Sequence, residues 1–253
     1  MIGDRHAGEE MGLAGALVGQ AVGRDQSAGD REALRHQPLF AGLTAERLAR
    51  LTQGAFVQGL PKGILLFGQG EEASFLHVIL EGRVALFGSI EGEAEEVVEV
   101  FGAGDAIIAP AVLLRRPYLM SGRVVSEARI LLIPAETFRF HVAEDVRLAH
   151  AAALLLAGYW RQLVTQIKNL KLRSGAERLA AYLLALATQA EGPASVTLPE
   201  ERKLIASRLG LTPETLSRAF RGLAAYGVSG HGRQVEIAEL ARLREFTRWD
   251  GLR

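Results

Sequence analysis

The pattern of apolar and polar positions divides the chain into a strand-rich part and a helix-rich part. From residue 54 to residue 133, short apolar runs alternate with glycine-containing turns; the runs are Ile64–Phe67, Phe75–Glu81, Arg83–Ile90, Glu95–Phe101, Tyr118–Ser126 and Arg129–Ile133. Runs of this length and spacing predict antiparallel strands that form a barrel or sandwich. Gly82 separates two of the runs, and we expect a tight reversal of the chain there.

Helical periodicity is found on both sides of these strands. A short helix is predicted over residues 43–51, with Thr44 as its N-cap. After the strands, the pattern predicts a short helix over 134–142 and a long helix over 144–171, whose acidic beginning and basic end suit the helix dipole. Another amphipathic helix is predicted over 176–190. The fold class expected from this order is α+β.

The long helix has two apolar strips. One strip follows the 4-3-4-3 spacing of a coiled-coil seam and contains Leu156, Trp160, Leu163, Ile167 and Leu170. The second strip lies in the first half of the helix and contains Leu148, Ala152, Leu155 and Tyr159. If one strip packs on the strands, the seam is available to a second copy of the chain, which predicts a homodimer. The alternative is a helix buried within one chain.

The most specific motif lies near the C-terminus. Two helices are predicted over residues 200–209 and 213–226, and the tight turn Gly210-Leu211 joins them. Thr212 can cap the second helix, and Pro213 suits its first position. A helix, a tight turn and a second helix form the arrangement that seats the second helix in the major groove of DNA.

Polar side chains gather on the face of this second helix that lies opposite its apolar side. Glu214, Ser217 and Arg218 are spaced i, i+3 and i+4, so they share one face near the helix N-terminus. Short β-prone segments over residues 228–237 predict a β-hairpin wing. We therefore predict a winged helix-turn-helix that binds double-stranded DNA, with base and phosphate contacts from Arg208, Thr212, Glu214, Ser217, Arg218 and Arg221.

Composition narrows the function further. The 253 residues include 29 Lys and Arg and 29 Asp and Glu, so binding to nucleic acid would depend on a local basic face rather than on net charge. The absence of cysteine excludes disulfides, thiolate zinc sites and cysteine-ligated iron–sulfur clusters. No apolar run can span a bilayer, and no secretory signal, nucleophile elbow or P-loop is evident. We expect a cytoplasmic protein that is not an enzyme and does not bind a membrane.

Taken together and in order, these features resemble the CRP/FNR family of bacterial transcription regulators over residues 35–250. The recognition-helix segment Pro213-Glu214-Thr215-Leu216-Ser217-Arg218 is similar to the E-x-x-S-R signature of the FNR branch. The resemblance implies an N-terminal β-roll like that of cyclic-nucleotide-binding domains, a long dimerisation helix and a C-terminal winged helix-turn-helix. It also implies a dimer that binds an inverted repeat of TTGAT-type half-sites and contacts RNA polymerase.

The sensor segment departs from the cyclic-nucleotide branch of the family, which holds phosphate with a G-E-L element and a later R-S or R-T pair. Here Ala109 or Pro110 takes the position of the glutamate. Met120 replaces the arginine of the later pair and directly precedes Ser121. A buried phosphate without a cation is a poor site, so we predict no cyclic nucleotide as effector. The predicted sensor pocket is apolar and contains Ile108, Ala109, Pro110, Leu114, Leu119 and Met120.

An apolar sensor pocket leaves other effectors open. Residues 101–126 and the recognition helix look most like the dissimilatory nitrate respiration regulators (DNR), which sense nitric oxide through haem. A haem iron needs an axial ligand such as histidine; the candidates are His36, His77, His141 and His150, of which we favour His36 and His77. Two alternatives stand beside haem-based sensing: a ligand-independent regulator of the same fold, and a β-roll signalling module that gates a partner protein.

These observations divide the chain into four predicted parts. Residues 1–33 are rich in glycine and alanine without sustained periodicity, which is typical of a mobile extension. The β-roll sensor domain is predicted over 34–142, the long dimerisation helix over 143–172, and the winged helix-turn-helix domain over 173–253.

Overall fold

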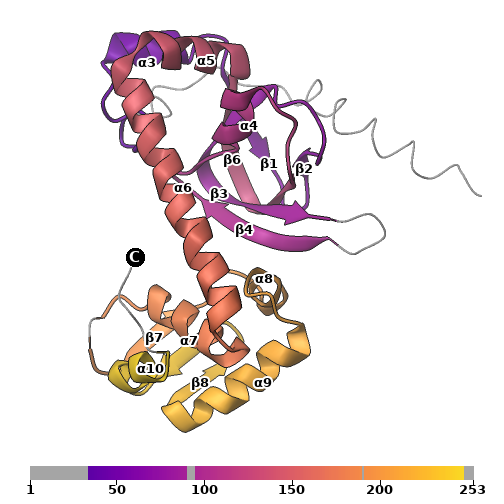
Figure 1. The fold of residues 1–253 in the computed structure, drawn as a ribbon, viewed down its shortest axis with the longest axis vertical. Helices are drawn as coiled ribbons and strands as arrows, with labels where there is room; N and C mark the ends of the chain where they lie inside the picture. Colours follow the sequence, from indigo (N-terminus) through magenta and orange to yellow (C-terminus); the bar gives the residue numbers. More distant parts are fainter. Residues whose placement is uncertain (1–33, 90–94, 190, 248–253) are drawn as a thin grey trace, which may run out of the picture. The chain divides into compact units, whose positions relative to one another are not determined.

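The computed structural model describes residues 34–89, 95–189 and 191–247, and the predicted extension at 1–33 lies outside them (Figure 1). The described residues form two compact units that divide between Tyr159 and Trp160, inside the long helix α6 (Val146–Leu172). The fold class is α+β, with a β-roll in the first unit and a helix-turn-helix domain in the second. Within the described ranges, no helix is both long and apolar enough to cross a membrane.

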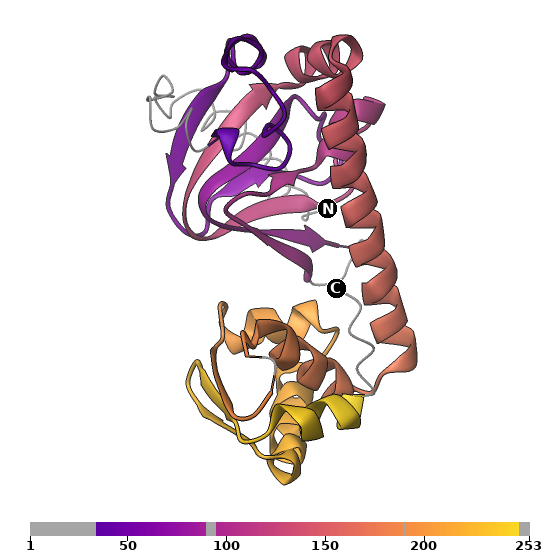
Figure 2. The same ribbon diagram turned by 90° about the vertical axis from the view of Figure 1, so that its left-hand side faces the viewer.

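The first unit is a curled antiparallel sheet around an apolar core (Figures 1 and 2). Its strands are β1 (Phe56–Leu60), β2 (Leu65–Phe67), β3 (Phe75–Gly88), β4 (Glu96–Gly102), β5 (Ala106–Ile107) and β6 (Ser121–Pro134). β3 and β6 pair along most of their length; β1 and β2 then pair with β6, while β4 and β5 pair with β3. The strands β1 and β5 were not predicted.

Gly82 does not reverse the chain, contrary to our prediction. β3 and β6 are each one continuous strand, and the predicted pairs of short runs are the halves of these two strands. Gly82 has a φ of 82° and lies where the register between β3 and β6 shifts. A Cβ at this position would lie 2.1 Å from the carbonyl oxygen of Glu127, so the close approach of β6 requires glycine in a bulge rather than a turn.

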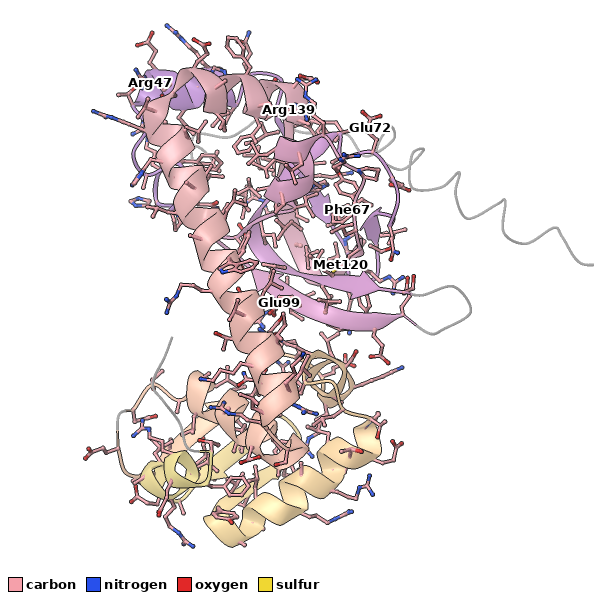
Figure 3. All side chains as sticks on the ribbon, viewed as in Figure 1. Arg47, Phe67, Glu72, Glu99, Met120 and Arg139 are labelled. Atoms are coloured by element: carbon pink, nitrogen blue, oxygen red, sulfur yellow. The ribbon has the colours of Figure 1, made fainter. Side chains whose placement is uncertain are left out.

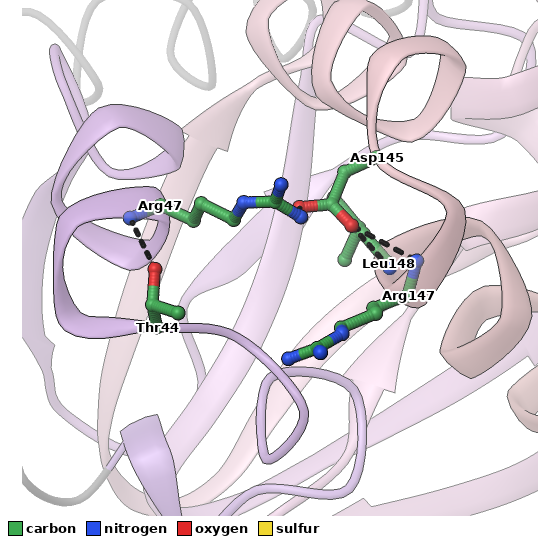
Figure 4. Close-up of polar contacts among 5 residues, drawn as sticks. All are labelled: Thr44, Arg47, Asp145, Arg147 and Leu148. Carbon is green, nitrogen blue, oxygen red and sulfur yellow. Dashed lines mark hydrogen bonds and ion pairs between the residues drawn. The ribbon is translucent and has the colours of Figure 1, made fainter.

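Helices cover one end of the roll, where α3 (Ala45–Leu51) lies beside α5 (Ala135–Glu144) (Figure 1). Thr44 caps α3 as predicted, because its hydroxyl accepts a hydrogen bond from the Arg47 amide. Asp145 joins α5 to α6 and accepts hydrogen bonds from the amides of Arg147 and Leu148 (Figure 4). The Arg47 guanidinium lies 2.5 Å from the other carboxylate oxygen of Asp145 and so ties α3 to the start of α6.

The first half of α6 packs on the β-roll through the predicted second strip. Leu148 and Ala152 are fully buried, and Leu155 packs against the same core. Tyr159 stacks edge-on against Phe101, and its hydroxyl donates to the carbonyl oxygen of Ala106 at 2.7 Å. The second strip therefore packs against the β-roll of the same chain.

The second unit has its own apolar core, centred on Leu179, Leu183 and Leu223. Its helices after α6 are α7 (Gly175–Leu186), α8 (Arg202–Arg208), α9 (Pro213–Leu223) and α10 (Leu240–Thr247), with a short 3₁₀ turn at Ala224–Tyr226. Its sheet contains β7 (Ala194–Thr197), β9 (Gln234–Ile237) and β8 (Val228–His231), in that spatial order. β8 and β9 form the predicted wing, and β7 is an addition that the pattern did not predict.

Candidate nucleic-acid interface

Local sequence signals at Gly210, Thr212 and Pro213 define the beginning of the recognition helix α9. Gly210 has a φ of 63°, which closes the turn after α8 in a conformation that glycine adopts without strain. Thr212 is extended, and its hydroxyl accepts a hydrogen bond from the Thr215 amide at 3.2 Å. Pro213 occupies the first turn. The apolar side of α9 is buried through Leu216, Ala219 and Leu223.

The opposite side of α9 presents polar side chains to solvent. Glu214, Ser217, Arg218 and Arg221 are all exposed, and the structure brings the first three together at the N-terminal end of the helix. The pKa of Glu214 is lowered by a hydrogen bond with its own main-chain amide, and further by the Thr212 hydroxyl and the charge of Arg218. The face therefore offers an anionic acceptor beside a cationic donor.

Two arginines of α8 border this face. The Arg208 guanidinium carbon lies 5.8 Å from the centre of the Tyr182 ring, in cation–π contact. Arg202, which sequence reasoning missed, lies 4.5 Å from the centre of the Phe220 ring in α9 and donates to the carbonyl oxygen of Gly232 at 3.2 Å. Arg202 thereby connects the recognition helix to the tip of the wing.

The predicted seam on α6 is exposed over most of its length. Trp160 is 69% exposed, and Leu163, Ile167 and Leu170 are each about half exposed. Leu156 differs, because it packs partly against the core of the β-roll. Val164 is also exposed and widens the strip, although it was not predicted as a seam residue. A contiguous apolar strip of this kind is typical of a protein interface.

The predicted sensor pocket is only partly brought together. Between β5 and β6 the chain forms a short helix, α4 (Ala109–Leu114), that the pattern did not predict. Ala109 is buried, while Ile108 and Met120 pack partly against the core, as Figure 3 shows for Met120 inside the curled sheet. The other predicted pocket residues are exposed: Pro110 and Leu114 lie on the solvent side of α4, and Leu119 lies in the segment between α4 and β6.

Strain marks the beginning of α4. Ile108 has a φ of 60° and a ψ of 15°, a left-handed conformation that is unusual for a β-branched residue. Such a position costs on the order of 1–3 kcal/mol and persists only where the surroundings hold it. Arg139 of α5 contributes to this hold, because its guanidinium donates to the carbonyl oxygen of Val112 in α4 at 2.9 Å.

The two candidate haem ligands lie in different environments. His36 is exposed. His77 is buried in β3, with its ring centre 5.0 Å from that of Phe67 and 6.5 Å from that of Tyr118. Burial lowers the pKa of His77 to about 4, against the opposite effect of a hydrogen bond with the main chain of Phe75. The imidazole is therefore neutral at physiological pH, and its Nδ1 has no hydrogen-bond partner.

Comparisons with known proteins agree with both units. The family model described as a cyclic nucleotide-binding domain matches residues 57–145, and the Crp-like helix-turn-helix domain matches residues 177–246. A solved structure from Ruegeria pomeroyi, described as a candidate cyclic nucleotide binding protein, is 33% identical, with a TM-score of 0.58 over 87% of this chain and 97% of that one.

Two curated relatives are similar over most of their length. The cyclic AMP receptor protein of Thermus thermophilus is 29% identical over 84% of this chain and 97% of its own. The nitrogen fixation regulation protein FixK of Azorhizobium caulinodans is 27% identical over 83% of this chain and 88% of its own. Fold, interface and relatives define a DNA-binding transcription regulator and not an enzyme. The chain belongs to the CRP/FNR family.

Proposed function

We propose that the protein is a homodimeric regulator that recognises an inverted repeat of TTGAT-type half-sites. The observation that carries the proposal is the exposed cluster of Glu214, Ser217 and Arg218 at the N-terminal end of α9. Arg218 can donate two hydrogen bonds to O6 and N7 of guanine, and Glu214 can accept one from the amino group of cytosine or adenine. Ser217 is short enough to lie against a thymine methyl group.

The apolar strip on α6 supports the dimer. Trp160, Leu163 and Ile167 present apolar area to water in the single chain, and removing that area from water favours assembly with a second copy. A two-fold dimer matches an inverted repeat, because each recognition helix then meets one half-site. Family resemblance adds RNA polymerase as a further partner, and the proposal places the protein in the cytoplasm with its DNA.

The proposed effector is not a cyclic nucleotide, although the names of several relatives refer to cyclic AMP. The hydroxyl of Ser121 accepts a hydrogen bond from the Gln69 amide at 3.0 Å, and Met120 beside it supplies no cation for a phosphate. Ala109 or Pro110 takes the position of the family glutamate, and neither supplies a carboxylate for a ribose.

Haem-based sensing of nitric oxide stays a hypothesis for the same segment. His77 offers the neutral imidazole that an iron requires, but Phe67 and Tyr118 enclose it, so these residues do not fit a haem as placed. The hypothesis requires the two aromatic rings to move. The Soret band of protein loaded with haem tests it: a His36→Ala, His77→Ala double variant that keeps an unchanged band refutes this choice of ligands.

The experiment that tests the proposed function is a fluorescence titration of the purified protein with a TTGAT inverted repeat and with a scrambled duplex. We expect binding to the repeat that is tighter by a factor of about 10³ or more at physiological salt. Equal affinity for both duplexes contradicts the base contacts. Absence of binding to either duplex favours the β-roll signalling module, and tight binding without any added effector favours the ligand-independent regulator.

A further inference from the structure

One half-buried arginine joins the end of α6 to the turn of the helix-turn-helix. Arg178 lies in the first turns of α7, and its Nη1 donates to the carbonyl oxygen of Arg173 at 2.9 Å, just after α6 ends. Its Nη2 donates to the carbonyl oxygen of Gly210 at 3.3 Å, in the turn between α8 and α9. The Nε of Arg178 is enclosed without a hydrogen-bond partner. One planar guanidinium therefore bridges two segments that lie far apart in the sequence.

Two glycines bring the same segments into contact. A Cβ added to Gly210 would lie 2.9 Å from Cδ2 of Leu170, near the end of α6. A Cβ added to Gly175, in the first turn of α7, would lie 2.9 Å from Cδ2 of Leu211 and 3.7 Å from Cγ2 of Thr215 in α9. The end of α6 and the beginning of the recognition helix thus pack more closely than side chains at these positions would permit.

We propose that Arg178 is a positioning residue that fixes the orientation of the recognition helix relative to the end of α6. The inference rests on the proposed function, because α6 carries the seam of the proposed dimer. Leu170 belongs to that seam and also touches the turn at Gly210. An arginine that holds this contact sets the separation of the two recognition helices in the dimer, and thereby the spacing of half-sites that the protein prefers.

A series of inverted repeats tests this role, with the two TTGAT half-sites moved apart or together by one and two base pairs. The variant is Arg178→Met, which keeps an unbranched apolar stem and removes both hydrogen bonds. The matched control is Arg242→Met, because Arg242 also donates to a main-chain carbonyl oxygen of this unit, that of Ala225, away from α6. A duplex with a single half-site measures base contact without any requirement on spacing.

For the wild type and Arg242→Met, we expect one preferred spacing. For Arg178→Met, we expect the ratio of affinities between the preferred spacing and its neighbours to fall by roughly tenfold, the factor that corresponds to one hydrogen bond from a charged donor. Affinity for the single half-site should change by less than about twofold, because no base contact is lost. An equal loss at every spacing, with an unchanged ratio, overturns the inference and leaves Arg178 a purely structural role.

A second variant serves if Arg178→Met does not fold. Gly175→Ala adds one methyl group against Leu211 and separates the two segments without touching the guanidinium. We expect a changed spacing preference here as well, and an unchanged preference in this variant overturns the inference. If the wild type does not prefer any inverted repeat to a scrambled duplex, the proposed function itself fails, and this inference fails with it.

Discussion

The guanidinium of Arg218 donates a hydrogen bond to the hydroxyl of Thr215, 3.0 Å away and one turn back along α9. The same hydroxyl lies 3.1 Å from that of Thr212, so three side chains form a chain along the beginning of the recognition helix. This chain orders Arg218 before DNA is bound and so reduces the side-chain entropy that binding costs. The base-reading geometry that we propose is therefore partly present in the free protein.

The first prediction concerns the bases read by α9. Arg218→Ala should cost on the order of 1–3 kcal/mol on a TTGAT inverted repeat and little on a scrambled duplex, because a base contact discriminates whereas a phosphate contact does not. Glu214→Ala should weaken binding in the same selective way. Binding titrations measure the affinity of both variants for both duplexes.

The alternative for Glu214 is a structural role at the N-terminus of α9. Its lowered pKa reflects contact with its own main-chain amide and with Thr212, as a capping carboxylate would show. In that case Glu214→Ala loses equal affinity on both duplexes, together with a lower melting temperature. The comparison of Glu214→Ala with Glu214→Gln then separates charge from hydrogen bonding.

A second prediction concerns Arg208, which we assign to phosphate. Arg208→Ala should weaken binding to cognate and scrambled duplexes by similar factors and reduce the slope of log affinity against log salt by about one. Arg208→Lys keeps the charge and should restore most of that slope. A loss of affinity confined to the cognate duplex would show that Arg208 contacts a base rather than a phosphate.

The parts of the fold that could be predicted are those specified by local signals. Thr212, Pro213 and Gly210 determine the helix-turn-helix within a few residues of chain, and its boundaries were predicted closely. Gly82 shows the limit of such signals, because glycine serves a turn and a bulge equally well. Only the pairing of β3 with β6 decides between the two, and that pairing is formed by residues far apart in the sequence.

The site was predictable to a similar extent. The exposed face of α9 follows from helical spacing alone, whereas Arg178 and Arg202 act through main-chain carbonyl oxygens about thirty residues away in the sequence. Any residue can supply a main-chain carbonyl oxygen, so no sequence motif predicts the contact. The outward side of α4 was missed for another reason: a short apolar segment does not reveal by its pattern which of its residues face the core.

A third prediction tests the seam on α6. Leu163→Glu or Ile167→Glu places a charge in the interface, which is strongly destabilising when no partner neutralises it, so a monomer with weakened DNA binding is expected. Leu154→Glu is the matched control, because Leu154 is also exposed but lies nine residues from Leu163, on the opposite side of the helix. Sedimentation of the three variants decides: dimers throughout would mean that the seam is misplaced.

A fourth prediction concerns cyclic nucleotides. Calorimetric titration with cyclic AMP or cyclic GMP should show no binding at micromolar concentrations, because Met120 and Ala109 provide neither a cation for the phosphate nor a carboxylate for the ribose. Micromolar binding of either nucleotide contradicts the assignment. A Met120→Arg variant gives the complementary test, since it adds the missing cation beside Ser121.

The last prediction follows from the buried imidazole of His77. In the unfolded chain this group takes up a proton at its ordinary pKa of 6.5, whereas in the folded β-roll burial lowers the pKa to about 4. The unfolded state therefore binds more protons between these values, and the contribution of neutral His77 to stability, full above pH 6.5, is lost as the pH falls towards 4. The difference amounts to about 3 kcal/mol over that interval.

A His77→Leu variant should remove this part of the acid sensitivity, because leucine fills the apolar surroundings of Phe67 and Tyr118 without a titrating group. Denaturant titrations of wild type and variant at pH 7, 5.5 and 4 measure the difference between their free energies of unfolding. Repacking of the core around leucine changes the free energy of unfolding by the same amount at every pH. Loss of the titrating imidazole makes the difference between wild type and variant depend on pH. The exposed His150→Gln substitution controls for the loss of a histidine elsewhere. A difference that is the same at all three pH values would show that His77 takes up its proton as readily in the folded β-roll as in the unfolded chain.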